Sequence, residues 1–385
     1  MTEFSTIASD QIRCSYFPIC SGCEIHDAVT SPQIYNDVKS FFQSIDPSLL
    51  VPLHHQEIIG WRTRSKLAVR GTEIQPEIGL FKRGTHEVVS IPDCPLHHPA
   101  INKAYQAVRQ KIIEMKLPPY REDQLTGILR YLQFVVERKS RRVQLSLSVN
   151  RQGKDPVVDR FVKQLYKEGM FLGIWVNYLP GSTNRIFGDK WELIAGEPYL
   201  VENLCGLTFS LHPACFAQAH LSLFERILKS VQQSIQTEAN VVEFYAGIGV
   251  IGLSVAHLCK KVICSEINPY SEECFHLSRL QLAPALQKKV SFVLGSVEKK
   301  LDLVDQGDVL IVDPPRKGLD PCLLDKILSS SHLKQLIYVS CGFYSFKRDC
   351  EKLLEKGWKV EKAEAYLLFP GTNHVETLCV LTRCS

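Results

Sequence analysis

The chain has 385 residues, of which 45% are hydrophobic and 22% charged, which is the composition of an ordinary globular protein of two or three domains. The 45 lysine and arginine residues against 41 acidic ones give a net charge of +4, which is too small to indicate nucleic-acid binding by itself. The hydrophobic and charged fractions exclude disordered and fibrous proteins. No apolar segment after Met1 has the form of a secretory signal, and the longest apolar stretch, 241–258, contains Glu243 and His257. We therefore predict a cytoplasmic protein without a membrane span.

Four cysteines in the first hundred residues predict a metal centre. Cys14, Cys20 and Cys23 lie within ten residues of one another, and Cys94 follows between two prolines and close to an aspartate. In a cytoplasmic protein, clustered thiols indicate metal binding before disulfides. Four thiolates suit an iron–sulfur cluster or a tetrahedral zinc ion, and their spacing alone does not decide between the two. The alternative is a set of unrelated thiols.

The first two hundred residues mix helix and strand patterns. Residues 101–115 have the apolar spacing of a helix, whereas apolar residues alternate over 143–149 as in a strand. This mixture predicts an α+β domain. A change of texture places its boundary near residue 210, which gives domains 1–210 and 211–385.

Two basic segments of this region are candidate RNA contacts. Residues 60–66 carry Arg62, Arg64 and Lys66 beside a tryptophan. Residues 138–142 carry four cations between two strand-like runs. Such cations contact phosphates, although 138–142 would equally suit a solvated hairpin turn.

Beyond about residue 208, strand-like apolar runs alternate with helical patterns. The runs 241–244, 262–265, 309–312 and 336–339 are separated by segments with helix-like spacing. This alternation is typical of a parallel sheet in an α/β fold. Residues 375–381 break the rhythm and suit a last, antiparallel strand. In such sheets ligands bind beyond the carboxyl ends of the strands, so the loops there form the candidate site.

The first of these strands leads into the glycine-rich turn Gly247-x-Gly249-x-x-Gly252. Small residues let the backbone approach a ligand. Glu266, at the end of the next strand, suits a carboxylate that accepts hydrogen bonds from ribose hydroxyls. The turn fits NAD(P) or FAD as well as S-adenosylmethionine, and also a tight turn without a ligand.

Three later positions carry groups suited to covalent chemistry. Asp313 opens the rigid loop Asp-Pro-Pro-Arg-Lys-Gly, Cys341 follows the run 336–339, and Glu376 stands at the start of the last strand. A thiol and a carboxylate beside a cofactor turn suit nucleophilic catalysis with a general base. Cys341 taken alone would equally suit a buried structural thiol.

The order and spacing of these segments resemble the RNA (uracil-5-)methyltransferase family. The resemblance covers nearly the whole chain and rests on 243–249, 313–319, 340–342 and 374–376, and on residues 216–218, similar to a cofactor-binding Phe-x-Gln segment. It implies an α/β fold with a C-terminal Rossmann-like class I methyltransferase domain and an N-terminal α+β domain that carries a four-cysteine metal centre. It also implies an enzyme that forms 5-methyluridine in RNA with S-adenosylmethionine.

The resemblance implies a role for each candidate residue. Cys341 matches the nucleophile that attacks C6 of uracil, and Glu376 matches the base that removes the C5 proton. The positions that match cofactor contacts are Gln218, Tyr245, Glu266 and Asp313. The positions that match ligands of a [4Fe-4S] cluster, found in the branch acting on ribosomal RNA, are Cys14, Cys20, Cys23 and Cys94. We therefore expect structured RNA, and specifically 23S rRNA, as the partner.

The chain also departs from the family pattern. Ala246 replaces the usual cysteine, Val250 replaces a cofactor-contacting asparagine, and 342–345 replace Asn-Pro-x-Thr after the nucleophile. The alternative substrate for the same chemistry is tRNA, and the cysteine cluster argues against it. An NAD(P)-dependent oxidoreductase would leave the loop at 313–318 unexplained. Both it and a non-catalytic RNA-binding protein would leave Cys341 and its carboxylate partner without a purpose.

Overall fold

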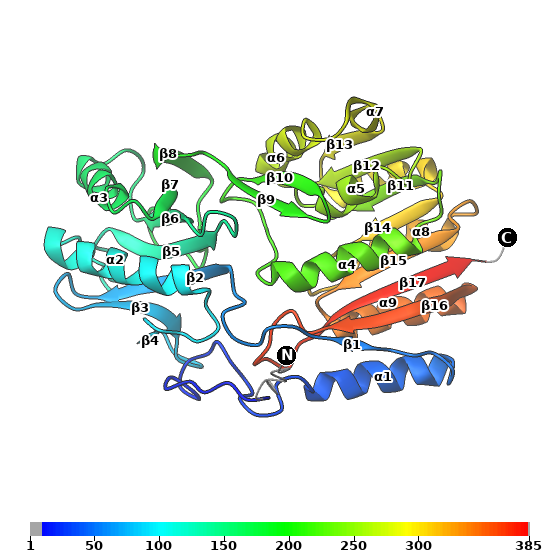
Figure 1. Ribbon diagram of the computed structural model, residues 1–385, viewed down its shortest axis with the longest axis horizontal. Coiled ribbons are helices and arrows are strands. Elements are labelled where there is room, and N and C mark those ends of the chain that lie inside the picture. The colour runs from blue at the N-terminus through cyan, green and yellow to red at the C-terminus, as the bar shows by residue number, and fades with distance from the viewer. Residues whose placement is uncertain (1–9, 384–385) are drawn as a thin grey trace, which may run out of the picture.

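Two large β-sheets with helices packed on them make up residues 10–383, the part of the chain that the computed structural model describes (Figure 1). None of the helices in this part is long and apolar enough to cross a membrane. The residues directly after Met1, on which the prediction of no secretory signal depends, lie outside it, and the cytoplasmic location stays a prediction.

The first sheet contains seven strands: β2 (Arg64–Gly71), β3 (Pro76–Phe81), β4 (Val88–Ser90), β5 (Leu129–Val136), β6 (Val143–Val149), β7 (Phe171–Tyr178) and β8 (Lys190–Gly196). Their order is β4-β3-β2-β5-β6-β7-β8. Two helices, α2 (Pro99–Met115) and α3 (Pro156–Tyr166), bury their apolar sides on one face. Only β6 and β7 run parallel in this sheet, because α3 crosses between them. The helix predicted over 101–115 and the strand predicted over 143–149 are confirmed.

The second sheet contains eight strands: β1 (Leu53–His54), β11 (Asn240–Phe244), β12 (Lys261–Glu266), β13 (Val290–Leu294), β14 (Val309–Val312), β15 (Gln335–Ser340), β16 (Trp358–Tyr366) and β17 (Glu376–Arg383). Their order is β1-β16-β17-β15-β14-β11-β12-β13. Strands β11 to β15 are parallel, whereas β17 runs antiparallel to β15 and β16. The predicted parallel sheet and its last antiparallel strand are confirmed.

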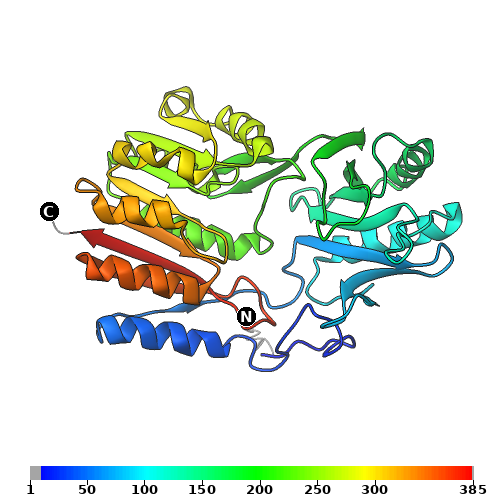
Figure 2. The same cartoon turned by 180° about the vertical axis from the view of Figure 1, so that it is seen from behind.

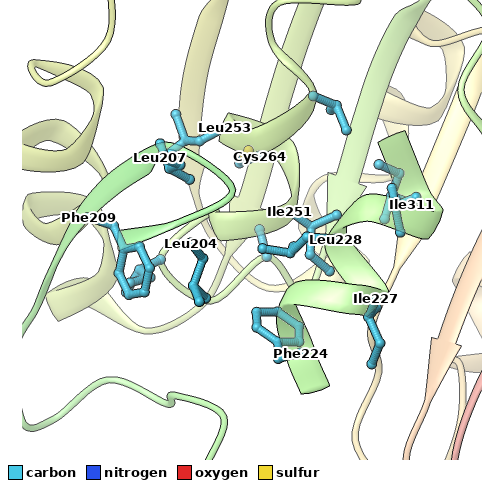
Figure 3. Packing of buried hydrophobic residues seen from close by; sticks show 14 of the residues in the cluster. Leu204, Leu207, Phe209, Phe224, Ile227, Leu228, Ile251, Leu253, Cys264 and Ile311 are labelled. Carbon is cyan, nitrogen blue, oxygen red and sulfur yellow. The ribbon is translucent and has the colours of Figure 1, made fainter. Parts of the chain in front are cut away.

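Helices cover both faces of this second sheet. On one face lie α4 (Leu221–Ser234), α5 (Val250–Val255) and α6 (Pro269–Arg279), and on the other α1 (Gln33–Ile45), α8 (Pro321–Ser329) and α9 (Phe343–Glu355). The hairpin of β9 (Leu200–Leu204) and β10 (Leu207–Leu211) joins the first layer, where Leu204, Phe224 and Ile311 lie in one apolar cluster (Figure 3). The remaining short elements are α7 (Pro284–Gln287), η1 (Val297–Lys299) and η2 (Leu301–Gln306).

The structure differs from the predicted division at residue 210 in one respect. Strand β1 pairs with β16, and α1 packs beside it on the second sheet, so that residues 33–54 lie with the C-terminal elements (Figure 2). The reason is that α1 has an apolar side which the second sheet buries, and an amphipathic pattern does not tell which sheet it will cover.

Phe42 tests whether α1 is an integral part of the second sheet. Its side chain is fully buried, with its ring centroid 5.8 Å from that of Phe346 on α9. Because truncation leaves a cavity, we expect Phe42→Ala to lower the free energy of unfolding by about 3–5 kcal/mol in urea denaturation. Leu50→Ala, at a position that is 86% exposed, is the control and should change it by less than about 0.5 kcal/mol. Equal stability of the two variants would contradict this packing.

Candidate active site

One cavity of about 640 Å³ opens where the parallel strands of the second sheet end. Its walls come from the loops after β11, β12, β13, β14 and β15 and from the start of β17. The structure brings together on it all the residues predicted for catalysis and cofactor binding: Gln218, Tyr245, Glu266, Asp313, Cys341 and Glu376. Their placement agrees with the rule for open α/β sheets, and their roles remain predictions.

The register of β15 against β17 sets Cys341 opposite Glu376. In this antiparallel pair Ser340 lies opposite Thr377, and the same register extended by one residue pairs the next two positions. Opposed residues in an antiparallel pair have Cα atoms about 5 Å apart. The thiol and the carboxyl group therefore line the same cavity, although 34 residues separate Cys341 from β17 along the chain.

The Cys341 thiol is half-buried at this point, and its Sγ lies 4.0 Å from the carbonyl oxygen of Pro314. Burial raises the pKa of Cys341 to about 12, and the negative charges of Glu376 and Asp313 add to the rise. The Arg316 guanidinium opposes it. In the free protein the thiol therefore keeps its proton at neutral pH.

The carboxyl groups beside the thiol are also desolvated. Glu376 is 2% exposed, and within residues 10–383 its Oε1 has no hydrogen-bond partner. Burial and the charge of Asp313 raise the pKa of Glu376 well above its usual range, and burial raises that of Asp313 to about 7. An unpartnered buried carboxyl oxygen has a high free energy, so it is available to a bound ligand.

Backbone N–H groups after β11 and β12 fix a carboxylate on the cavity wall. Glu266 accepts hydrogen bonds from the backbone N–H groups of Gly247 at 3.0 Å, Ile267 at 2.8 Å and Asn268 at 2.9 Å. Tyr245 has a φ of 58°, in the left-handed region, and its hydroxyl accepts from Asp320 N at 3.0 Å. The turn is thus held in a strained shape from both sides.

Glu243 is a buried residue of β11, just before this turn, to which the sequence assigned no role. Its Oε2 accepts from Gly252 N at 2.9 Å and lies 3.2 Å from Cys264 Sγ. A Cβ on Gly252 would lie 2.5 Å from that sulfur and 2.6 Å from that oxygen, so the third glycine of the motif is required by close helix–strand packing. Burial raises the pKa of Glu243 to about 8. An acidic residue inside an otherwise apolar strand was the signal for it.

The four predicted metal ligands gather around a second cavity of about 450 Å³. Its lining residues include Cys14, Cys20, Cys23 and Cys94, and no aspartate or glutamate is among them. It shares Phe216, Gln218 and Phe369 with the first cavity. Within the part of the chain that the structure describes, however, no three His, Cys, Asp or Glu residues stand close enough to hold a single metal ion.

The two basic segments have different surroundings. Arg62, Arg64 and Lys66 line the second cavity, the thiol cavity, together with the four cysteines. In contrast, Arg138 binds Glu202 and Arg142 donates to the Phe171 carbonyl at 2.6 Å, so the second segment is largely a structural turn.

Comparisons with known proteins agree with this geometry. The model of the tRNA (Uracil-5-)-methyltransferase family matches residues 272–384. The chain is 43% identical to an uncharacterized RNA methyltransferase of Protochlamydia amoebophila, over 98% of this chain and 99% of that protein. It is 29% identical to one of Nostoc, over 88% of this chain and 73% of the other.

Among solved structures, the chain is similar to the Pyrococcus abyssi tRNA (uracil-54, C5)-methyltransferase in complex with S-adenosyl-L-homocysteine. The TM-score is 0.73 at 22% identity, and the match covers 96% of this chain and 88% of that one. This likeness shows the fold, which is that of a Rossmann-like α/β methyltransferase. The chain belongs to the RNA (uracil-5-)methyltransferase family and is a transferase, as the resemblance predicted.

Arg316 is a candidate residue that the sequence left without a role, and its effect on the thiol can be measured. Because its charge lowers the pKa of Cys341, we expect Arg316→Ala to slow alkylation of Cys341 by iodoacetamide, since only the thiolate reacts. Arg316 is exposed, so the effect should be about two- to fivefold at pH 8. In both proteins the rate should rise with pH, because the thiol pKa lies far above neutrality.

The rates are read from the mass of the peptide that contains Cys341. Lys317→Ala, an exposed neighbour in the same loop, is the control and should alkylate like the wild type. Equal slowing in both variants would show that the loop shape, and not the Arg316 charge, acts on the thiol.

Proposed function

We propose that the protein transfers a methyl group from S-adenosylmethionine to C5 of one uridine in a structured RNA and so forms 5-methyluridine. The observation that carries the proposal is the register that sets the Cys341 thiol opposite the buried Glu376 carboxyl group, beside Asp313. Uracil C5 is a poor nucleophile, so a methyl acceptor at that carbon requires both a thiolate and a base.

The cavity fits the cofactor. Glu266 presents a fixed carboxylate for ribose hydroxyls, and Gly247 faces open space where a Cβ would meet nothing within 4 Å. The residues that would hold S-adenosylmethionine are Gln218, Tyr245, Glu266 and Asp313. When bound, the cofactor supplies an electrophilic methyl group on a positively charged sulfonium.

The chain's own residues perform the remaining chemistry. The Cys341 thiolate adds to C6 of uracil, which makes C5 electron-rich and able to accept the methyl group. Glu376 then removes the C5 proton, the C5–C6 double bond forms again, and the C6–S bond breaks to release the thiolate. The target base must leave its stack to reach Cys341. Phe216, which is 65% exposed on the cavity wall, offers a flat surface on which that base can stack.

For the substrate we favour 23S rRNA, and tRNA is the alternative of the same chemistry. The four cysteines around one cavity support the first, whereas the similar archaeal enzyme is named for tRNA. Arg62, Arg64 and Lys66 would hold the RNA backbone next to the catalytic cavity. In support of this, Arg64 Nη1 is buried without a hydrogen-bond partner among the described residues, and the Arg62 guanidinium lies 4.6 Å from the Trp61 ring centroid.

For the thiol cavity we propose a [4Fe-4S] cluster, with zinc as the alternative. A cubane cluster offers a separate iron to each thiolate, so its ligands stand further apart than those of one tetrahedral ion. The support for a thiolate-bound centre is that the four cysteines line one cavity with no aspartate or glutamate among its lining residues. The neighbouring cations balance the negative charge that four thiolates bring.

The methylation is tested with anaerobically purified protein, labelled S-adenosylmethionine, and unmodified ribosomal and transfer RNA offered separately. We expect 5-methyluridine at one position of ribosomal RNA by mass spectrometry and none with Cys341→Ala, because no other cysteine of residues 10–383 lines that cavity. Cys205→Ser, a half-buried thiol outside both cavities, should retain activity. Label only in tRNA would keep the reaction and overturn the substrate, and label in neither RNA would overturn the proposal.

The metal is tested by elemental analysis of the same preparation. We expect about four iron atoms and four acid-labile sulfides per chain, with brown colour that is lost in Cys94→Ser and kept in Cys205→Ser. A content of one zinc atom per chain would show that the site binds zinc and not the proposed cluster. Absence of both metals from a folded, anaerobic preparation would reduce the cysteines to unrelated thiols.

A further inference from the structure

The loop that leads into Glu376 is bound to the cysteine segment at the other end of the chain. The Gly371 carbonyl oxygen accepts hydrogen bonds from the backbone N–H groups of Glu24, at 2.7 Å, and Ile25, at 3.0 Å. In return the Glu24 carboxylate accepts from Asn373 N at 3.0 Å. These bonds join segments that are 349 residues apart. Residues directly after Cys23 thus hold the loop that carries the proposed base.

Gly371 allows this close approach. It is buried and has a φ of 89°, a conformation that residues with a side chain rarely adopt. A Cβ there would lie 3.0 Å from Cδ1 of Ile12 and 3.3 Å from Sγ of Cys23. The loop backbone therefore lies directly against one of the four predicted metal ligands.

Two further contacts fix the same loop. Phe369 lines both cavities and meets Trp61 edge to face, with ring centroids 6.1 Å apart. The Asn373 side-chain oxygen accepts from Ile34 N of α1 at 2.9 Å. Between β16 and β17 the loop is thus anchored by protein on several sides, and its last residues pass directly into the strand that begins at Glu376.

We infer that Glu24 and Gly371 are positioning residues for Glu376, and that a metal centre on Cys23 fixes the segment that contains Glu24. The inference rests on the proposed role of Glu376 as the base. Glu376 is the first residue of β17. Sheet hydrogen bonds therefore hold the chain after it, whereas the loop holds the chain before it. Its Oε1 has no hydrogen-bond partner among the described residues that would fix the carboxyl group by itself.

The reaction gives this positioning a specific signature. When Glu376 takes the C5 proton, the C5–H electron pair forms the C5–C6 double bond and the C6–S electron pair returns to Cys341. A misplaced base leaves thiolate addition and methyl transfer unaffected but slows this last step. The methylated RNA then remains covalently bound to Cys341. A general loss of structure would instead reduce the covalent adduct together with the product.

The first experiment compares Glu24→Ala, Glu24→Gln and Asp27→Ala in the full chain. Asp27 is an exposed carboxylate of the same segment, and among the described residues its side chain is bound only to His26. We expect Glu24→Ala to lower kcat about tenfold with KM for RNA within twofold, and to increase the protein–RNA adduct on denaturing gels. Glu24→Gln keeps an oxygen that accepts from Asn373 N and should restore most of kcat, and Asp27→Ala should behave as wild type. A fall in kcat without more adduct, or no fall, would overturn the positioning role.

The second experiment needs no turnover. Hydrogen exchange of residues 369–376 is compared in anaerobic wild type, in wild type treated with ferricyanide and EDTA to remove the metal centre, and in Glu24→Ala. We expect faster exchange there in the last two, with α9 unchanged. Unchanged exchange after metal removal would overturn the link between the centre and the loop. If wild type formed no 5-methyluridine, the proposed function would fail while this exchange result would still decide the coupling.

Discussion

Antiparallel pairing of β15 with β17 is the constraint on which the active site depends. In a purely parallel sheet, every loop at the ligand-binding edge follows the carboxyl end of a strand. Because β17 runs the other way, its amino end reaches that same edge. A residue that opens β17 therefore faces a residue that follows β15. This single reversal brings the proposed base to the same edge of the sheet as the proposed nucleophile.

The same placement favours the protonated forms of the acidic groups in the free site. Burial raises the pKa values of Asp313, Cys341 and Glu376 in this corner, and the negative charge of Asp313 adds to the rise at the other two. Arg316 is the cation that acts on both the thiol and Glu376. A positively charged ligand at this corner would lower all three pKa values. Its binding and the loss of protons by the site would therefore favour each other, and binding of the proposed cofactor would promote formation of the Cys341 thiolate.

Sequence patterns predicted the parts of the fold that depend on local order. The alternation of apolar runs gave the parallel strands and the reversed last one, and the rule for strand ends brought the predicted residues to one cavity. Contacts between distant segments could not be read in this way. The pairing of β1 with β16, and the bond between Glu24 and Asn373, depend on packing that leaves no periodic signal. Arg138 was ambiguous for the same reason, since its partner Glu202 lies 64 residues away.

The position of the cysteine segment also bears on why a methyltransferase would hold a metal centre. The proposed reaction moves a methyl group and a proton, and its steps leave no net electron to transfer. Between Asp10 and Pro32, however, the chain forms no helix and only isolated bridges, so turns and loops make up this segment. A segment of this kind is ordered by cross-links such as metal–thiolate bonds. Since its backbone holds Gly371 and its Glu24 holds Asn373, order imposed at the thiols by the proposed centre would reach the loop before Glu376 through these hydrogen bonds. The centre would then contribute to catalysis through geometry, by fixing the base on which release of the product depends.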